Sequence, residues 1–532
     1  MKLRRAGLIP AVVTAVVAGA SLLAACSGSE SPATSQQAAG TVFTYDTTAP
    51  VMVDGWDPAT EYSDGIIAMS EMYETLTRYN PATHAVSPLL ATSWSSSDSA
   101  KTWTFHLRHG VYFHTGRLMT SRAAKASIER TIRLGGGASY VWGAVKTIGT
   151  PGKYTLVFHL SRPAPLALEA SADYSAYIYD TKAAGGSGKL TAWLNAGHDA
   201  GTGPYTVQSW NKGQEFEVTL TKFGKYWGGW SGRHFTKVAY RVVPQDTTAA
   251  QLLRSGQVSF IEQINPSLWS SFKGDQSIRL VSSPSWQNLL AQLNTQRLGL
   301  KVRQAIAYAI DYKGILAALR GAGVAASGIV PRGLFGHFSD LPNYSHDKAR
   351  AAALLKAAGY GPGRKPLDLS LTYTQGDSDE QVVATILKSD LATLNVHVNA
   401  QSLAWPTQWA KAKSSSPAGR QDIFFEYWWP DYPDPYSWFS NLLKSESQPY
   451  FNLSYYSNPS LDGMIGKVES EVATNSSAAS RLYRNMQVTV LRQAPLVDLY
   501  TKNYQYAMDS GISGFRVNPA YPNVVFAYDL KP

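Results

Sequence analysis

The sequence predicts a mixed α/β fold with two or three lobes. Segments with the alternation of strands and segments with helix caps follow one another along most of the chain. The 532 residues also exceed what one hydrophobic core usually supports. Aromatic residues form 12% of the chain, including 15 Trp and 30 Tyr, which suits both large cores and ligand clefts.

The first clear elements lie between residues 102 and 137. Thr102–Arg108 alternates apolar and polar side chains and predicts a half-buried strand. A turn then leads to a second short strand, Val111–His114. Thr120 and Ser121 can cap a helix over Ala123–Arg133, which is followed by three glycines.

Later segments repeat both patterns. Helices are predicted from polar caps and terminal glycines over Thr247–Ser255, Val302–Leu319, Asp347–Ala358 and Ser378–Leu394. Strands are predicted over Tyr154–Leu160, Phe216–Lys222, Val238–Val243 and Leu367–Tyr373. This alternation favours α/β lobes.

Cys26, the only cysteine, ends an export signal. Three positive charges in Met1–Arg5 precede an apolar run, Ala6–Leu23, and two alanines. Residues 1–25 therefore predict a lipoprotein signal peptide, with lipid attached to Cys26. The polar stretch that follows has no aromatic residue, so residues 26–40 predict a lipid anchor and flexible linker.

The remaining composition limits the partners of the chain. The net charge of +10 includes three signal charges, and no Lys/Arg run occurs elsewhere. This pattern favours an anionic envelope surface, and we expect no nucleic-acid partner. With one cysteine, the mature chain has no internal disulfide.

Seven motifs in order along the chain resemble one protein family. They are KTWTFHLRHGVYFHTGRLMTSRAAKASIER (101–130), GTGPY (201–205), KYW (225–227), KVRQAIAYAID (301–311), YSHDKARAAALLKAAGY (344–360), DYPDP (431–435) and NLSYYSNP (452–459). Behind a lipoprotein signal, this series is similar to the family 5 extracellular solute-binding proteins. These are the peptide, nickel and oligosaccharide receptors of ABC importers.

The resemblance implies a two-lobed clamp of the periplasmic-binding-protein type (type II, cluster C-like) with an inserted domain. Lobe I would comprise residues 41–76, 196–295 and 498–532, the inserted domain 77–195, and lobe III 296–497. The hinge would lie at the crossings near 295 and 497. Closure about such a hinge buries a solute and presents a new surface to a permease.

The resemblance also places a ligand anchor at Asp431. In peptide-binding relatives, an aspartate at this position pairs with the α-ammonium of the ligand. Trp428, Trp429 and Tyr432 flank it, and the prolines of this segment stiffen the loop. A carboxylate buried there is costly unless a cation or hydrogen-bond donors meet it. The alternative is a structural aspartate that closes a turn.

Three further stretches supply candidate ligand contacts. Asp54 and Trp56 resemble the first cleft loop of the family, with the backbone as the contact. Trp286 and Asn288 lie in another cleft-lining stretch. Trp405, four residues before Trp409, raises an oligosaccharide ligand, since flat rings stack on sugars; packing in the core is the alternative.

One loop departs from the dipeptide-binding pattern. Those relatives place an arginine for the ligand carboxylate just after the strand that corresponds to Leu367–Tyr373. Here Thr374–Glu380 is acidic and contains no arginine. A short peptide whose carboxylate is held there is not expected, while longer peptides and other solutes stay open.

The motifs do not indicate a metal site, a cofactor or an enzyme. His106, His109 and His114 do not converge, although a nickel chelate held by an organic carrier stays open. Ser270 and Lys273 have the spacing of penicillin-recognising hydrolases, but the companion motifs are absent. Asp431 and Asp434 leave a glycoside hydrolase as the alternative from another class.

We therefore expect a monomeric, lipid-anchored receptor on the extracytoplasmic face of the cell membrane, facing the periplasm where an outer membrane is present. It would capture an oligopeptide, or alternatively an oligosaccharide, and deliver it to an ABC permease. A receptor that senses the solute for another partner would use the same cleft.

Overall fold

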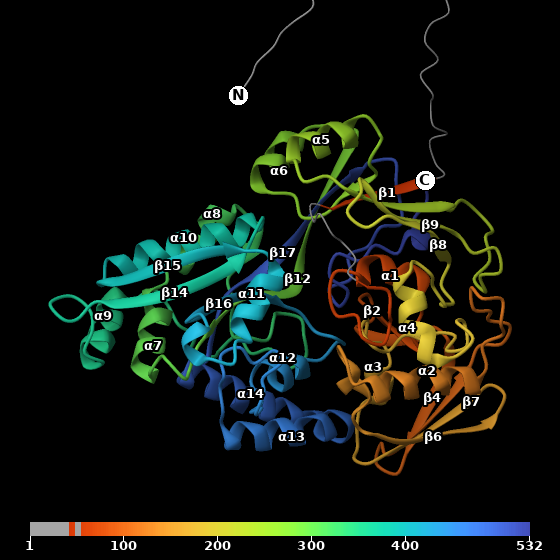
Figure 1. Ribbon diagram of the computed structural model, residues 1–532, viewed down its shortest axis with the longest axis horizontal. Helices are drawn as coiled ribbons and strands as arrows, with labels where there is room; N and C mark the ends of the chain where they lie inside the picture. The colour runs from red at the N-terminus through yellow and green to blue at the C-terminus, as the bar shows by residue number, and fades with distance from the viewer. Residues whose placement is uncertain (1–41, 48–54) are drawn as a thin grey trace, which may run out of the picture. The chain divides into compact units, whose positions relative to one another are not determined.

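A mixed sheet of eleven strands forms the centre of the fold (Figure 1). The structure is a computed structural model that describes residues 42–47 and 55–532. The hydrogen-bonded order is β15 (Val396–Leu403), β14 (Leu367–Thr374), β16 (Ile423–Trp428), β12 (Ile278–Leu293), β17 (Leu496–Asp509), β11 (Phe260–Ile261), β1 (Val42–Thr47), β10 (Lys237–Val242), β9 (Phe216–Lys222) and β8 (Tyr205–Trp210). Strand β13 (Gly323–Val324) pairs with β17 beside this order.

The two longest strands, β12 and β17, connect the two halves of this sheet. They pair antiparallel from Ile278 opposite Asp509 to Gln292 opposite Leu496. The ladder is interrupted between Pro284 and Asn288, because proline has no amide proton to donate. Figure 1 shows both strands running side by side between the β14–β16 group and the β1, β8 and β9 group.

Helices pack against the β14–β16 half around an apolar core that includes Leu371, Ile306 and Leu387. They are α7 (Leu300–Ala309), α8 (Tyr312–Leu319), α9 (Lys348–Ala357) and α10 (Ser378–Ala392). Helix α11 (Trp405–Ala412) packs against β14 and has its own small apolar cluster with Phe424 and Leu453. The single helix predicted over Val302–Leu319 is wrong. Ile310 is extended, with ψ 126°, and the Asp311 side chain accepts a hydrogen bond from Gly314 N at 2.9 Å, which begins a second helix.

A separate four-stranded sheet has the order β4 (Ala91–Ser97), β5 (Thr102–Leu107), β7 (Thr155–Leu160) and β6 (Val145–Gly152), and α2 (Ser121–Leu134) packs on it. The predicted strand at Thr102 and the predicted helix capped by Thr120 are confirmed. The strand predicted over Val111–His114 is wrong. Phe113 N donates to Arg117 O and Met119 N to Val111 O, so this segment closes a turn on itself.

The remaining elements are β2 (Thr77–Asn80), β3 (Ala85–Pro88), α1 (Ile66–Met72), α3 (Leu166–Glu169), α4 (Ser187–Asn195), α5 (Asp246–Arg254), α6 (Pro266–Phe272), α12 (Tyr436–Leu442), α13 (Pro459–Thr474), α14 (Ser476–Gln493), and the short 3₁₀ turns η1 (Ser139–Trp142), η2 (Pro417–Gly419) and η3 (Ala527–Asp529). The predicted elements at β7, β9, β10, β14, α5, α9 and α10 are confirmed to within about two residues at each end. The expectation of a mixed α/β fold is thus confirmed.

The GTGPY segment fixes the end of α1 by close backbone contact. Gly203 N donates to Met72 O at 2.8 Å. A Cβ added to Gly201 would lie 1.9 Å from the same carbonyl oxygen, so only glycine fits there. This contact holds Glu71 and Glu74 in place at the start of the segment leading to β2.

In the described part of the chain, none of the helices combines the length and the apolar character needed to span a membrane.

Candidate functional site

Asp431 lies three residues beyond the end of β16, in a loop that contacts other segments. Its half-buried carboxylate accepts a hydrogen bond from Tyr140 Oη and a long contact of 3.5 Å from Asn441 Nδ2. Its carbonyl oxygen accepts from Asp173 N at 3.3 Å. The loop therefore contacts two segments from the region 77–195.

The surroundings of Asp431 are anionic. Burial raises the pKa of this carboxyl to about 6, although the bonds from Tyr140 and Asn441 offset part of the effect. Asp173 is 1% exposed, and neither of its carboxylate oxygens has a hydrogen-bond partner among the described residues. Burial, and then the nearby Asp431, raise the pKa of Asp173 well above its usual value. The described residues thus place two carboxyls together without a basic partner.

The neighbours of Asp431 in the loop are held by the core. Trp428 is buried, donates from Nε1 to Ser437 Oγ at 3.2 Å, and packs edge-on against Phe451. Tyr432 is buried and Trp429 is half-buried.

Asp434, not Asp431, is the aspartate that closes the turn. Its Oδ1 accepts from Tyr436 N at 2.9 Å and from Tyr483 Oη. Burial raises the pKa of Asp434 to about 7, and these two hydrogen bonds oppose that rise. The two carboxylates thus differ in their hydrogen-bond donors, since no described backbone amide donates to the carboxylate of Asp431.

Trp286 and Asn288 lie on β12 next to the same loop. Asn288 stands opposite Trp428 in the sheet, accepts from Trp438 Nε1 at 3.2 Å, and donates to Asp498 at 2.7 Å. Trp286 packs against Tyr79, with ring centroids 5.4 Å apart. Both residues are nearly fully buried, so their side chains are already engaged with the protein. A role for them as ligand contacts stays a prediction.

A group of exposed and half-buried rings lies beside β16, and we call it the aromatic patch. It comprises Tyr62, Trp405, Trp409, Tyr450 and Phe451. Tyr62, Trp405 and Tyr450 are 38%, 37% and 40% exposed, which is high for such large rings. Trp405 and Trp409 lie 5.6 Å apart, and Tyr62 meets Tyr450 edge-on at 6.0 Å. The patch joins the segment after residue 55 to segments beyond 400.

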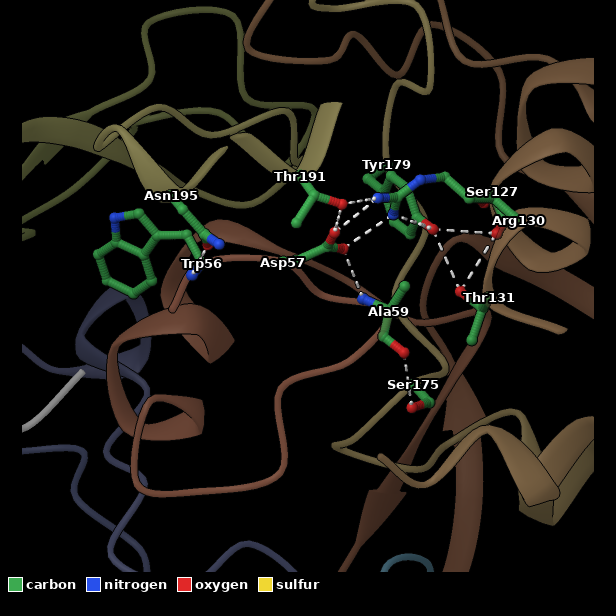
Figure 2. Close-up of polar contacts among 10 residues, drawn as sticks. All are labelled: Trp56, Asp57, Ala59, Ser127, Arg130, Thr131, Ser175, Tyr179, Thr191 and Asn195. Carbon is green, nitrogen blue, oxygen red and sulfur yellow. Dashed lines mark hydrogen bonds and ion pairs between the residues drawn. The ribbon is translucent and has the colours of Figure 1, made fainter. Parts of the chain in front are cut away.

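The segment after residue 55 is fastened to α2 by a buried ion pair (Figure 2). Arg130 donates to both oxygens of Asp57 at 2.8 and 2.5 Å, and Thr191 Oγ1 donates to the same carboxylate. Burial alone would raise the pKa of Asp57, but these bonds outweigh it and hold the pKa below its usual value. Trp56 is fully buried, and its backbone N donates to Asn195 Oδ1 at 3.0 Å (Figure 2). A role for the backbone of this segment as a ligand contact stays a prediction.

Two residues selected from the sequence, Cys26 and Asp54, lie outside the described residues.

The acidic loop at 374–380 forms the start of α10. Asp377 caps Glu380 N at 2.8 Å, and Lys502 from β17 lies 3.6 Å from Asp379. Lys502 is also 3.1 Å from Gln263 Oε1. The basic side chain next to this loop, Lys502, thus comes from β17, more than 100 residues away in sequence. The sequence of the loop itself therefore gave no signal for it.

The other candidate motifs have local partners. His114 pairs with Asp199, and His109 stacks on Tyr154. Ser270 is exposed on α6 and donates to Pro266 O at 2.8 Å. Throughout residues 42–47 and 55–532, no group of three or more His, Cys, Asp or Glu side chains is arranged to hold a metal ion.

Sequence reasoning missed Tyr140 and Asp173. Both reach Asp431 only through the tertiary fold, at 291 and 258 positions' distance along the chain. Neither stands in a motif that marks it, so the sequence carried no signal for them.

Comparison with known proteins connects this geometry to a family. The family described as "Bacterial extracellular solute-binding proteins, family 5 Middle" matches residues 85–450. The probable D,D-dipeptide-binding periplasmic protein DdpA of Escherichia coli K12 is 27% identical over 441 residues, which cover 82% of this chain and 83% of that protein.

Solved structures show the same fold. The periplasmic binding protein AgaA of A. tumefaciens R10, in complex with agropinic acid, superposes with a TM-score of 0.79 at 25% identity, over 92% of this chain and 98% of AgaA. DppA of Helicobacter pylori, in complex with the peptide STSA, gives 0.80 at 22% identity, over 92% and 98% of the two chains. Because the family match spans most of the chain and the two-lobed fold agrees, this protein belongs to the bacterial extracellular solute-binding proteins of family 5.

Proposed function

We propose that the protein is a lipid-anchored extracytoplasmic receptor that captures an oligopeptide between two lobes and delivers it to an ABC importer. Family membership supports the receptor role. The division into lobe I (41–76, 196–295 and 498–532), an inserted domain (77–195) and lobe III (296–497) belongs to this proposal. The β12–β17 ladder, which joins the two halves of the sheet, is its hinge.

The observation that carries the proposal is the lack of a basic partner for Asp431 among the described residues. A half-buried carboxylate with only Tyr140 and Asn441 as donors gains most from a cation, and a peptide brings one at its amino end. The separate structural role of Asp434 leaves Asp431 free for this task.

The other end of the peptide is not held at the acidic loop. Among the described residues, the loop offers a carboxylate no free cation, because Lys502 is already engaged by Asp379 and Gln263. Peptides longer than two residues, whose carboxylate lies elsewhere, fit this arrangement better. The dipeptide named for DdpA and the tetrapeptide bound to DppA support a peptide as the ligand class.

The experiment is a thermal-shift screen of soluble Ser27–Pro532 against peptides of two to eight residues, with native mass spectrometry of the hits. A ligand of the folded state raises Tm by mass action. Each hit is repeated with an N-acetylated copy of the same peptide and with Asp431→Asn. Loss of the shift in both supports the assignment. An N-acetylated peptide that binds as tightly as the free amine contradicts it.

A second candidate ligand is an oligosaccharide, favoured by the exposed rings of the aromatic patch. Rings such as Trp405 and Tyr450 offer flat faces for the C–H surfaces of sugars. Stabilisation by oligosaccharides alone, lost in Trp405→Ala and kept in Asp431→Asn, would select this candidate over the peptide.

A further inference from the structure

A cavity of about 340 Å³ lies between α1, β2 and the C-terminal segment. Its walls include the rings of Tyr73, Tyr177, Tyr521 and Phe526. This volume is in the range of small-molecule sites, and aromatic walls are typical of them. Asp173 connects the cavity to the loop of Asp431, since it lines the cavity and its backbone N donates to Asp431 O at 3.3 Å.

Several residues that line this cavity carry buried polar atoms that have no hydrogen-bond partner among the described residues. These atoms are both carboxylate oxygens of Asp173, Oε2 of Glu71 and Oη of Tyr177. Asp173 and Glu71 are each 1% exposed, and Tyr177 is 5% exposed. Buried polar groups are almost always paired in folded proteins. Three such side chains around one cavity therefore indicate an occupant that supplies hydrogen-bond donors.

The charges of the residues that line the cavity indicate whether the hydrogen-bond donors of the occupant are neutral or cationic. Glu74 is satisfied by Trp227, Thr202 and Tyr226. Arg78, the one basic residue of the lining, lies 3.6 Å from Asp529 and over the Phe526 ring. Oε1 of Glu71 accepts from Ala527 N at 2.6 Å, so the acceptors without a partner among the described residues are Oε2 of Glu71 and both carboxylate oxygens of Asp173. Burial raises the pKa of Glu71 to about 8.

We propose that this cavity binds an organic cation, a primary ammonium or a guanidinium, with Asp173 and Glu71 as the acceptors and the surrounding rings as cation–π partners. Because Asp173 lines the cavity and is also bonded to Asp431, we assign the cation to the captured solute. On the proposed function, on which this identification rests, the solute is a peptide with a basic side chain near its amino end.

The direct test uses a small probe that needs no peptide. n-Butylammonium and n-butanol have similar shapes and differ in charge. Both are titrated by calorimetry into Ser27–Pro532 carrying Asp431→Asn, so that the proposed anchor does not contribute. We expect saturable binding of the amine and at least about tenfold weaker binding of the alcohol. Adding Asp173→Asn lowers amine affinity at least about tenfold, whereas adding Asp368→Asn, at an exposed carboxylate, leaves it unchanged.

A second readout separates a binding role from a structural one. A cation favours the ionised carboxyls, so its binding releases protons and its affinity rises from pH 6 to 9. The apparent enthalpy then varies with the ionisation heat of the buffer. Tyr177→Phe removes one hydroxyl only. It should weaken binding of the amine without changing proton release. It replaces Asp173→Asn as the test variant if that variant does not fold.

Equal binding of the amine and the alcohol overturns the inference. This is the result expected if the cavity holds only water. Unchanged amine binding in both Asp173→Asn and Tyr177→Phe also overturns it. Peptides with lysine or norleucine at their first two positions are compared on the wild-type chain. If peptides bind without a lysine preference and the amine does not bind, the inference fails and the proposed function stands. If the amine binds and no peptide does, the proposed function fails instead.

Discussion

Asp431 and Asp434 are three residues apart, yet their carboxylates have different partners. Asp434 accepts from a backbone amide and from Tyr483, as an aspartate that shapes a turn does. Asp431 has only side-chain donors, and its pKa is raised to about 6. The motif predicts both aspartates, but only their surroundings assign them different roles.

Peptide affinity should depend on pH through Asp431. An ammonium partner stabilises the ionised carboxylate and lowers its pKa from about 6, so binding releases a proton. For a peptide without a basic side chain, affinity should therefore be highest near pH 7, where the α-ammonium is still protonated, and weaken as the pH falls through 6, by up to about tenfold per pH unit. Calorimetry between pH 5 and 8 measures this dependence.

The matched variants for this titration are Asp431→Asn and Asp431→Ala. Either should weaken a confirmed peptide by at least about tenfold, since removing one partner of a buried charge pair typically costs about 2–5 kcal/mol. Asp431→Asn should also remove the pH dependence between 5 and 7. A variant that keeps the wild-type profile would assign the titration to another group.

The part of the candidate site that could be predicted from the sequence is the part that lies within one local motif, residues 428–435. Trp428, Trp429, Asp431 and Tyr432 are contiguous, so a single loop brings them together. Tyr140 reaches the carboxylate of Asp431, and Asp173 reaches its backbone carbonyl oxygen, from far away in sequence. Such long-range contacts depend on the packing of whole elements, and no pattern of spacing in one chain encodes them.

At the scale of elements, prediction succeeded where caps and alternation were both clear. The helix α2 has Thr120 at its start and Gly135 in the left-handed region, φ 64°, at its end. The prediction failed at Ile310, because the apolar periodicity continues through the break between the two helices. An aspartate such as Asp311 can also occur inside a helix, so its capping role was not evident. The long strands β12 and β17 were not predicted, since buried segments do not alternate clearly.

The ion pair between the segment after residue 55 and α2 should contribute strongly to stability. Asp57→Asn leaves Arg130 buried without its counter-ion, and such a loss typically costs about 3–5 kcal/mol. Thermal and urea unfolding measure the change. Asp340→Asn is the control, because that carboxylate is 68% exposed in its pair with Arg484 and should cost less than about 1 kcal/mol.

The sign of the pH effect follows from the lowered pKa of Asp57. Its stabilisation is fully present above the unfolded pKa of about 3.9, and is lost as the pH falls through the lower folded value. The wild-type chain and Asp57→Asn should therefore converge in stability in strong acid. A stability gap that stays constant from pH 7 to below 3 would show that the carboxylate charge is not the cause.

Gly201→Ala should prevent correct packing of the GTGPY segment. The added methyl would lie 1.9 Å from Met72 O, which is backbone and cannot rotate away. We expect a lower yield of folded protein and a Tm loss of several degrees, measured by circular dichroism. Gly463→Ala, in α13 with open space around it, should be neutral or stabilising by about 0.5–1 kcal/mol.

At the scale of the whole molecule, the region 77–195 is bonded directly to the region 296–497. Arg162 Nε donates to Glu469 at 2.6 Å, Ser470 donates to Pro163 O, and Tyr140 donates to Asp431. These contacts cross the boundary of the proposed lobes near the proposed anchor. They are the bonds that opening about β12 and β17 would break.

The proposed anchoring predicts where the protein is found in cells. Cys26→Ser removes the thiol that lipid requires, so the protein should move from the membrane fraction to the soluble extracytoplasmic fraction and lose radiolabelled palmitate. Ser27→Ala, next to it, should change neither. A serine variant that stays with membranes after a salt wash would indicate a different attachment.

The strand order also fixes when the chain can finish folding. β1, the first described strand, pairs with β10 nearly 200 residues later and with β11, and β11 in turn pairs with β17 near the end of the chain. Such high contact order makes folding slow. During synthesis, the edge of β1 therefore stays unpaired until β10 has been made, and the sheet is closed only after β17 has been made. The topology itself therefore requires that this early edge be kept from pairing with other chains until the rest of the chain is available.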